Sequence, residues 1–331
     1  MTQISAKVLA RSRSVVTGKI ITTFELIYPR FILAELNTHS LLKRNSASSR
    51  AIPIAKVIEQ VRNDYAMPVH WGKNQPGMSA KEELVAPQLN EVKGMWEDAA
   101  MEAAYIAEKM DKCGAHKQVA NRIMEPFQWM KTVLTATEFD NFFYLRRHPD
   151  ADPNIAALAE CMWQAMHAAP IFDLYPGEWH VPYVHRKRAC PRLEGSFGPI
   201  EYWDLRDAVQ LTLEQALAVS SSCCAQTSFR TTDDSIEKAQ RIFERLVESK
   251  PVHASPFEHQ ATPMQATKGY SYRNTVNDYG VNNIDVQSWE PGITHMDRKC
   301  GFWSGNLNGF IQHRQLLPDN TCWNYEEQIN E

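Results

Sequence analysis

Hydrophobic and polar residues alternate near the start of the chain as they do in a β-hairpin. Residues 4–10 and 19–27 carry β-branched and apolar side chains at alternate positions, and Val16-Thr17-Gly18 lies between them. A period of two places successive side chains on opposite faces of a strand, and glycine favours a turn. We therefore predict two antiparallel strands joined at residues 16–18.

Apolar residues recur at helical spacing in several later segments. Residues 175–198 are rich in proline, glycine and arginine and predict a long loop, whereas residues 262–300 are polar and predict a lid or an interface. The mixture predicts an α/β (α+β) fold with an antiparallel or mixed sheet and several helices. The predicted helices cover residues 31–42, 54–65, 79–110, 131–145, 154–168, 211–222 and 233–249, and Gly114 ends the longest.

The composition fits a single elaborated domain, because 331 residues can bury a large core. The net charge of −4 argues against a general nucleic-acid-binding protein, so any basic site must be local. The chain has no run of about 18 apolar residues and no signal-peptide core, and its seven cysteines form no CxxC pair. We expect a cytoplasmic protein with reduced thiols and without a membrane or nucleic-acid partner.

Residues 29–51 contain the first candidate site. An apolar run ends at His39, and Arg44-Asn45-Ser46-Ala47-Ser48-Ser49-Arg50 follows shortly after. Serine hydroxyls, the asparagine amide and nearby backbone N–H groups can donate hydrogen bonds to a nucleotide phosphate, and Arg50 adds a permanently charged fork. The alternative is a helix end capped by serine and asparagine and followed by solvated basic residues.

Two further segments carry candidate chemistry. In His253-Ala254-Ser255-Pro256-Phe257-Glu258-His259 two histidines flank a carboxylate, but no third ligand lies at a recognisable spacing, so we predict no metal site. The alternative there is a purely structural strand. Residues 120–126 and 138–146 place Arg122 and Arg146 among apolar side chains, and their alternative is a helix with a core stripe and an arginine that reaches water.

The first segment resembles the signature of the flavin-dependent thymidylate synthases. That signature reads Arg-His-Arg, two residues, Ser, one residue, Asn-Glu, one residue, Ser, one residue, Arg-Tyr. Aligned on His39, the chain matches the signature at Asn45, Ser48 and Arg50. It differs at Thr38, Ser40, Lys43, Ser46 and Ala51.

The other two segments are similar to further motifs of the same family. Residues 253–259 match its His-x-Thr/Ser-Pro-Phe-Glu-His strand, and residues 120–126 and 138–146 resemble its Ala-Arg-x-x-Leu-Pro segment and Asn-Phe-x-x-Leu-Arg helix. In the family the Phe-Glu-His strand precedes the signature, whereas here it follows more than 200 residues later. The chain therefore resembles a circularly permuted member, with motifs in residues 1–170 and 216–331 and a loop or insertion at 171–215.

The resemblance implies a role for each matched residue. Arg146 would face the pyrimidine ring and favour ionisation at N3, which makes C5 more nucleophilic. Gln312-His313-Arg314 lies where the family keeps Arg-His-Arg and would restore part of the flavin cradle; its alternative is an ordinary amphipathic helix. The implied nucleotide-binding residues are Glu35, Ser46, Ser48, Arg50, Arg122 and Asn141, and the implied cofactor-binding residues are His39, Asn45, His253, Ser255, His259, His313 and Arg314.

The implied reaction is the reductive methylation of dUMP to dTMP. Methylenetetrahydrofolate supplies the carbon, reduced FAD supplies the hydride, and NADPH reduces the flavin again. This reaction needs no cysteine nucleophile, and no cysteine lies in the matched motifs. The implied partners are a pyrimidine deoxynucleotide, folate and three further copies of the chain, with active sites shared in a homotetramer. Two alternatives stay open: a hydroxymethylase of dUMP or dCMP, and a non-catalytic nucleotide-binding protein of the same fold.

Overall fold

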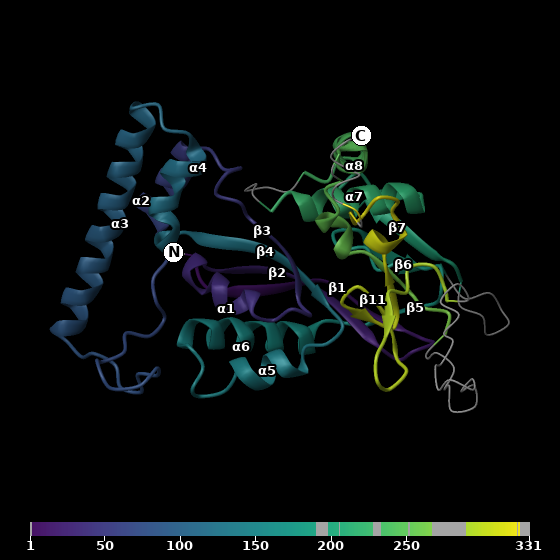
Figure 1. Ribbon diagram of the computed structural model, residues 1–331, viewed down its shortest axis with the longest axis horizontal. Coiled ribbons are helices and arrows are strands. Elements are labelled where there is room, and N and C mark those ends of the chain that lie inside the picture. The colour runs from purple at the N-terminus through teal and green to yellow at the C-terminus, as the bar shows by residue number, and fades with distance from the viewer. Residues whose placement is uncertain are drawn as a thin grey trace.

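A five-stranded sheet forms the centre of the computed structural model, which describes residues 2–189, 198–204, 206–227, 233–250, 252–266, 289–322 and 324. The strand order is β3-β4-β2-β1-β5 (Figure 1), and all neighbours are antiparallel except β1 and β5. The predicted hairpin is confirmed and extends further than predicted, because β1 and β2 each contain ten residues. The strands are β1 (Ser5–Ser14), β2 (Ile20–Pro29), β3 (Lys43–Ser46), β4 (Trp129–Ala136) and β5 (Phe172–Leu174).

Three helices cover one face of this sheet with apolar side chains. They are α1 (Leu33–Asn37), which continues the 3-10 turn η1 (Arg30–Ile32), α5 (Asp140–Arg146) and α6 (Pro153–Ala168). Phe24, Leu26 and Leu134 of the sheet and Leu158 of α6 are fully buried in this shared core. Burial of side chains of this size is the main force that holds the layers together.

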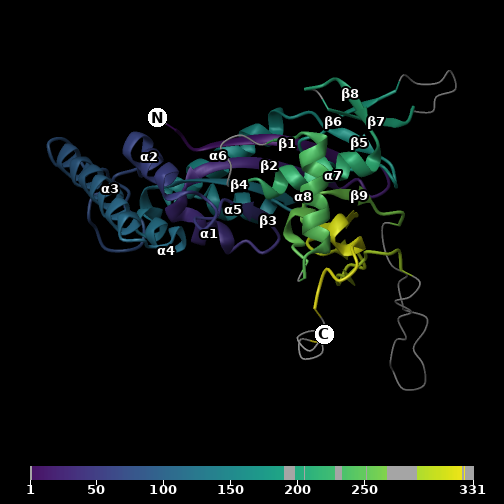
Figure 2. The same ribbon diagram turned by 90° about the horizontal axis from the view of Figure 1, so that it is seen from above.

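A separate helical core lies at one end of the sheet (Figures 1 and 2). It contains α2 (Ile54–Asp64), α3 (Gln88–Lys112), α4 (Lys117–Ala120) and the 3-10 helix η2 (Asn121–Phe127). Small residues on α3, such as Ala100 and Ala104, are completely buried and let α2 approach closely. The start of the chain is tied to this end, since the Thr2 backbone N–H donates to Asp64 Oδ1 at 2.8 Å.

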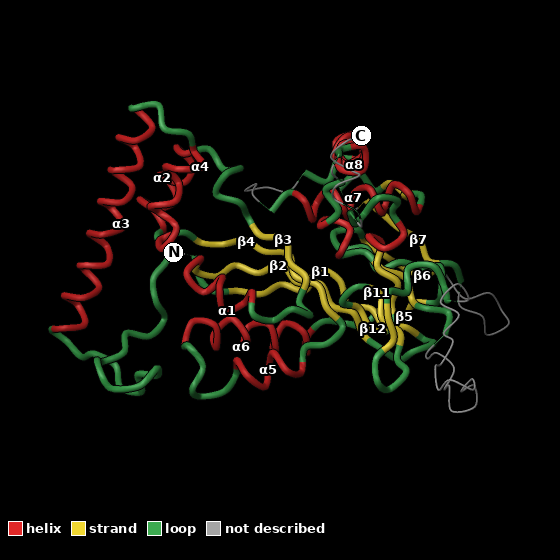
Figure 3. The backbone as a smooth tube through the Cα atoms, viewed as in Figure 1, coloured by secondary structure: helices red, strands yellow, loops and turns green. Residues whose placement is uncertain are grey.

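The opposite end combines a small sheet with two helices and the C-terminal strands. The small sheet contains β6 (His185–Arg188), β7 (Ile200–Asp204) and β8 (Val209–Leu211), and a capping box at Thr212 and Gln215 starts α7 (Leu213–Ala225), which packs beside α8 (Ile236–Glu248). Figure 3 shows the short strands of this end beside the long central ones. The remaining elements are η3 (Ser255–Glu258), β9 (Ala261–Pro263), β10 (His295–Met296), β11 (Phe302–Ser304), β12 (Leu307–Asn308), β13 (Phe310–Gln312) and η5 (His313–Leu316).

The α+β class is confirmed, and four helices lie within a few residues of their predicted positions, namely α2, α6, α7 and α8. The helix predicted at 131–145 is confirmed only from residue 140, where α5 begins, and is wrong before it: residues 129–136 form β4, whose β-branched residues pair with β2 and β3 on both sides. The helix predicted at 31–42 ends at Asn37, and that predicted at 79–110 starts only after Pro87. None of the described helices is long and apolar enough to cross a membrane.

Two further expectations about chain segments are corrected. Residues 253–259 are not a strand, because Pro256 lies inside the 3-10 helix η3 and the strand β9 begins only at Ala261. The region 171–215, expected to be a loop, contains β5, β6, β7 and β8, whose charged and aromatic side chains hide the strand pattern. Of the lid or interface predicted at 262–300, residues 267–288 lie outside the described residues.

Candidate functional site

The segment that resembles the family signature borders the edge of the central sheet. It begins at α1, turns through His39 and Ser40, and enters β3, the edge strand paired with β4. This path brings it against α5 on one side and η3 on the other. The signature segment therefore meets both of the other motif-bearing segments.

The first of these contacts joins His39 to Arg146. Arg146, the last residue of α5, donates from Nε to His39 Nε2 at 2.9 Å and from Nη2 to Thr38 Oγ1 at 3.1 Å. The edge of the His39 ring rests on Phe142 of α5, with ring centroids 5.0 Å apart. The predicted association of the signature with the 138–146 segment is thus present in the fold.

The charges around this contact favour a neutral His39. Burial lowers the His39 pKa, and the positive charges of Arg146 and Arg44 lower it further. Since Nε2 accepts a hydrogen bond from Arg146, the ring proton resides on Nδ1. Arg44 donates to the backbone carbonyls of Leu36 and His39, at 3.2 and 2.9 Å, and so holds the turn in place.

Two unpaired cations and one unpaired buried oxygen remain beside this contact. Arg146 and Arg44 have no ion-pair partner among the described residues, and the buried Oε2 of Glu35 on α1 accepts no hydrogen bond from them. Arg146 engages Nε and Nη2, which leaves the N–H groups of Nη1 free to donate. A ligand with both an acceptor and a donor edge would satisfy these groups.

A pocket of about 430 Å³ lies beside α1 and η2. Arg122 and Arg30 both pair with Glu125, at 3.5 and 2.9 Å, so one carboxylate is shared by two guanidinium groups. Because 58% of the Arg122 side chain is exposed, this arginine can contact an anion from solvent. The pocket is lined by Arg30, Phe31, Leu33, Ala34, Asn37, Arg122, Glu125 and Pro126.

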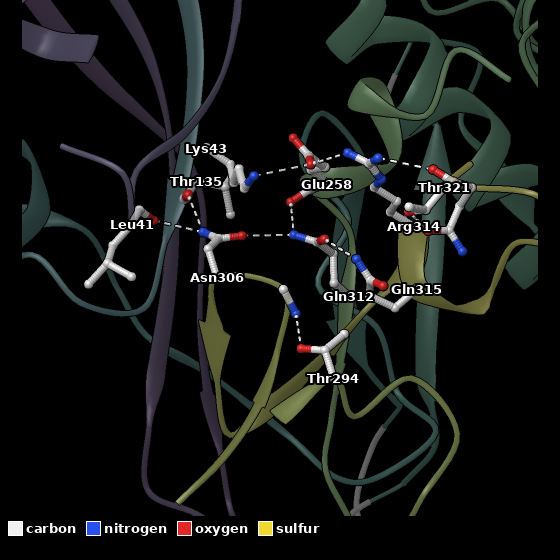
Figure 4. Close-up of polar contacts among 12 residues, drawn as sticks. Leu41, Lys43, Thr135, Glu258, Thr294, Asn306, Gln312, Arg314, Gln315 and Thr321 are labelled. Carbon is white, nitrogen blue, oxygen red and sulfur yellow. Dashed lines mark hydrogen bonds and ion pairs between the residues drawn. The ribbon is translucent and has the colours of Figure 1, made fainter. Parts of the chain in front are cut away.

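The second contact joins the signature to the two C-terminal candidate segments (Figure 4). Lys43 of β3 lies 3.4 Å from Glu258, and Arg314 Nη1 donates to Glu258 Oε1 at 2.7 Å. The Glu258 side chain is only 7% exposed, so its charge must be compensated by these cations. Residues 43, 258 and 314, far apart in sequence, therefore share one ionic cluster around a buried carboxylate.

A second pocket of about 470 Å³ adjoins this cluster. Its wall is fixed by Asn306, whose Nδ2 donates to the Leu41 carbonyl at 2.7 Å and whose Oδ1 accepts from Gln312 Nε2 at 2.9 Å (Figure 4). The pocket is lined by Ser40, Leu41, Lys43, His295, Asp297, Trp303, Gly305 and Asn306.

Several predicted site residues occupy the interior instead. His259 bonds through Nδ1 to Thr135 Oγ1 at 2.8 Å, and burial lowers its pKa to about 3. His313 packs among Trp179, Phe243 and Phe257, and burial lowers its pKa to about 4. Each ring is enclosed by protein, and each keeps one buried nitrogen without a hydrogen-bond partner, Nε2 of His259 and Nδ1 of His313.

Two polar residues of β3 also have partners within the protein. Asn45 Nδ2 donates to the Cys224 carbonyl at 3.3 Å, and Ser46 Oγ lies 2.8 Å from Thr132 Oγ1. They fasten the edge strand to α7 and to β4. Their predicted contacts with cofactor and nucleotide stay predictions.

The remaining predicted residues lie at the surface, except Ser48, which is half-buried. Arg50, Asn141, His253 and Ser255 are exposed, and Arg50 has no hydrogen-bond or ion-pair partner among the described residues. Of all predicted site residues, only Arg122 lines either of the two pockets described above. Within the predicted set, His39 and Arg146 contact each other, and Arg314 pairs with Glu258, which lies in a quoted motif but was not predicted as a site residue. The set does not share a single cavity of one protomer.

The residues expected to hold a flavin fit it only in part. His259 and His313 are enclosed and Arg314 is paired with Glu258, so these three form no open cradle in the protomer. His253 and Ser255 are exposed and could contact a cofactor. In the described part of the chain, no three His, Cys, Asp or Glu side chains gather into a metal-binding group.

The structure also adds residues that the pattern did not reveal. Arg30 and Glu125 stand within quoted motifs, and only the fold shows that they pair. Trp303 and Asp297 carry no motif at all. Cys223 and Cys224 are buried on α7, and burial raises the pKa of Cys223 to about 12, so neither is a thiolate nucleophile at neutral pH.

Comparisons with known proteins find a distant likeness only. No protein-family model and no curated protein matches the chain. Two solved structures of a UMP/dUMP methylase, PolB from Streptomyces cacaoi, bound with 5-Br UMP and with 5-Br dUMP, are similar to part of it. Each has 14% identity and a TM-score of 0.42, and the match covers 50% of this chain and 89% or 90% of the other. A likeness this distant carries no argument about activity.

Proposed function

We propose that the chain is an enzyme that binds a pyrimidine mononucleotide and modifies its C5 atom, and specifically that it makes dTMP from dUMP as a flavin-dependent thymidylate synthase. One observation carries the proposal. Segments that separately resemble three motifs of that family contact one another, through His39–Arg146 and through Lys43–Glu258–Arg314.

In this proposal the phosphate binds beside Arg122. Arg122 and Arg30 share one carboxylate, so the group carries a net charge of +1 from two arginines and Glu125. A dianionic phosphate is attracted to such a group, and a guanidinium can bind it with two parallel hydrogen bonds. Asn37 on the same pocket wall adds an amide that can recognise the sugar.

Arg146 acts on the base in this proposal. The bond to His39 fixes the guanidinium plane, and the free N–H groups of Nη1 donate to the pyrimidine edge. A fixed positive charge stabilises the negative charge that develops on the ring when C5 attacks the carbon donor. Glu35, with its unpaired buried oxygen, accepts from a donor on the nucleotide.

The cofactor belongs to the proposal as well. Bound FAD, once reduced by NADPH, would supply hydride to the carbon that methylenetetrahydrofolate provides. The exposed His253 and Ser255 would contact it, and exposed Arg50 suits a site completed by a neighbouring subunit of a homotetramer.

A direct assay tests the proposal. The purified protein is examined for flavin absorbance and then incubated with dUMP, or separately with dCMP, together with methylenetetrahydrofolate, FAD and NADPH, and the nucleotide product is identified by mass. We expect a product heavier by one methylene unit, and its formation should require FAD. A hydroxymethyl product, or methylation that proceeds without flavin, would overturn the specific proposal; no product from dUMP or dCMP would overturn the enzymatic one.

A further inference from the structure

Two arginines from different elements hold the turn that follows α1. Arg146 reaches it from α5, and Arg44 reaches it from the edge strand β3. Both contact His39: Arg146 donates to the ring nitrogen Nε2, and Arg44 donates to the backbone carbonyl, each at 2.9 Å. Arg44 stands at a position that the family signature leaves free, so the motif gives it no role. Its role has to be inferred from its contacts.

The guanidinium of Arg44 gathers three carbonyl oxygens at the end of α1. Nη1 donates to Leu36 at 3.2 Å and to His39 at 2.9 Å, and Nη2 donates to Asn37 at 3.5 Å. Carbonyl oxygens at the C-terminal end of a helix carry partial negative charge and stabilise a nearby cation. Burial lowers the pKa of Arg44, but a guanidinium stays charged at neutral pH. Arg44 therefore supplies the positive charge at this end of α1.

His39 is the side chain that would otherwise supply that charge. A histidine at the end of a helix normally takes up a proton more readily, because the carbonyl oxygens stabilise the imidazolium. Here Arg44 occupies those oxygens. Burial, together with the positive charges of Arg146 and Arg44, lowers the pKa of His39 instead. The imidazole is therefore neutral although it lies at a helix end.

The other groups around the turn do not reverse this balance. From α1, the buried Glu35 Oε2 has no hydrogen-bond partner, and from α5 the Phe142 ring packs against the imidazole. His295 and Asp297 of the C-terminal strands line the pocket of about 470 Å³ that the turn borders. The charges that act on the His39 pKa are those of the two arginines.

A neutral His39 is what allows Arg146 to stay in place. The Arg146 Nε–H needs an acceptor, and the imidazole offers a lone pair at Nε2 only while that nitrogen is unprotonated. The further contacts of Arg146, with Thr38 Oγ1 at 3.1 Å and the Glu35 carbonyl at 3.5 Å, are also made to uncharged acceptors. Arg146 is thus held without an opposing carboxylate, and its charge remains available to a ligand.

We propose that Arg44 is a positioning residue for the reaction proposed above. By occupying the carbonyl oxygens at the end of α1 it keeps His39 a neutral acceptor, and His39 in turn holds Arg146 in place. A proton on Nε2 of His39 would meet the N–H that Arg146 donates, so the contact would open. Only the last step, the action of Arg146 on the base, rests on the proposed function.

Nuclear magnetic resonance of the full chain with ¹⁵N-labelled histidine tests this link without turnover. His39→Gln identifies the His39 signal by its loss. In the wild type at neutral pH we expect a neutral His39 ring with its proton on Nδ1. Arg44→Met should move the midpoint of the His39 titration to higher pH, because it removes a positive charge and frees the carbonyl oxygens.

Arg11→Met is the matched control. Arg11 likewise donates to carbonyl oxygens at the end of a helix, those of Met166 and Ala169 after α6, but it has no contact with His39. We expect the His39 midpoint of this variant to equal that of the wild type.

A conservative variant sharpens the test. Arg44→Lys keeps a charge but offers one ammonium group to three carbonyl oxygens, so its midpoint should lie between those of wild type and Arg44→Met. Circular dichroism checks folding, and Arg44→Lys carries the comparison if Arg44→Met does not fold. An unchanged midpoint in the folded variant would overturn the proposal, as would a proton on Nε2 of wild-type His39.

Steady-state kinetics extend the test to the reaction. Arg44→Met should lower kcat at least about tenfold and leave the nucleotide KM nearly unchanged, because a displaced catalytic group costs rate. The acid limb of kcat should move to higher pH together with the His39 midpoint. An unchanged kcat would overturn the positioning role. If no C5 product forms at all, the proposed function fails, whereas the His39 titration still decides whether Arg44 keeps His39 neutral.

Discussion

The two faces of β2 and β4 are both fully buried at their centre, yet they are chemically opposite. One face presents Phe24, Leu26 and Leu134 to α5 and α6. The other presents Thr23 and Thr135, each with no exposed surface, to His180 and His259. The comparison shows that burial alone does not separate core from candidate chemistry, since a histidine from a motif can be as interior as a phenylalanine.

A continuous chain of hydrogen bonds links the polar face and ends at His259, whose Nε2 has no partner. Ser12 contacts His180 Nδ1 at 2.8 Å, and His180 Nε2 contacts Thr23 Oγ1 at 2.9 Å. Thr23 meets Thr135 at 2.7 Å, and Thr135 meets His259 at 2.8 Å. Hydroxyl groups can both donate and accept, so the chain crosses three strands with partners at each step.

The apolar face should have the largest single effect on stability. Phe24→Ala removes a fully buried ring that packs edge-on against Phe139, and we expect a loss of about 3–5 kcal/mol in the free energy of unfolding. Urea denaturation measures it. Val16→Ala in the exposed turn serves as the control, with a change within about 0.5 kcal/mol.

The sheet edge should control catalysis rather than stability. Arg146→Ala should lower kcat strongly, because it removes the charge proposed to act on the base. The expected loss of transition-state stabilisation is about 3–4 kcal/mol. Arg147→Ala, which instead loses a bond to Glu160 at 2.8 Å, should keep its activity. Steady-state kinetics compare them. Equal product formation by wild type and Arg146→Ala would reject the assigned role.

The polar face should depend on its hydroxyl groups. Thr135→Val keeps the shape but leaves Thr23 and His259 without a shared partner, and we expect a loss of about 1–3 kcal/mol in the free energy of unfolding. Urea denaturation beside wild type measures it. A change below about 0.5 kcal/mol would contradict the importance of this chain of bonds.

The same face should make the protein sensitive to acid. His259 has a folded pKa of about 3, below the unfolded value of about 6.5, and the His180 pKa is lowered in the same direction by burial. Below about pH 6.5 only the unfolded chain takes up these protons, so stability falls as pH falls, by about 1.4 kcal/mol per pH unit for each histidine. Unfolding curves between pH 7 and about pH 4 measure the slope. His259→Leu removes one of these histidines and should reduce the slope by about 1.4 kcal/mol per pH unit. An unchanged slope would contradict a neutral, buried His259.

The smallest effect concerns the phosphate. Arg122→Ala and Arg50→Ala should each raise the nucleotide KM about tenfold and leave kcat nearly unchanged, because phosphate binding is uniform between ground and transition states. Arg62→Ala, an exposed arginine paired with Glu108, is the matched control. A change confined to kcat would contradict the phosphate role.

Sequence patterns predicted the parts of the fold in which one face of an element is polar. The hairpin and the helices α2, α6 and α8 follow their expected periods. The pattern failed at β4, where Thr132, Val133 and Thr135 are buried on both faces and no alternation of polarity remains.

For the candidate site too, the sequence predicted some residues correctly and missed others. Local motifs identified His39 and Arg146, and the fold pairs them. Local sequence could not identify His180, because its partners Ser12 and Thr23 lie on distant strands. It also missed Trp303, whose bond to the nearby Asp297 belongs to no recognised motif. The sequence also could not show that His259 is buried, because a histidine in this motif can contact either a ligand or the sheet.

The bond between Asn306 and the Leu41 carbonyl spans 265 positions of the chain. Contacts between such remote positions require a long loop to close before they can form, and they slow the search for the native state. During synthesis, the contact between this turn and Asn306 must therefore wait for the strands around residue 306 to leave the ribosome. A nascent chain that ends before residue 306 can already possess its first hairpin, but it cannot complete this corner of the molecule.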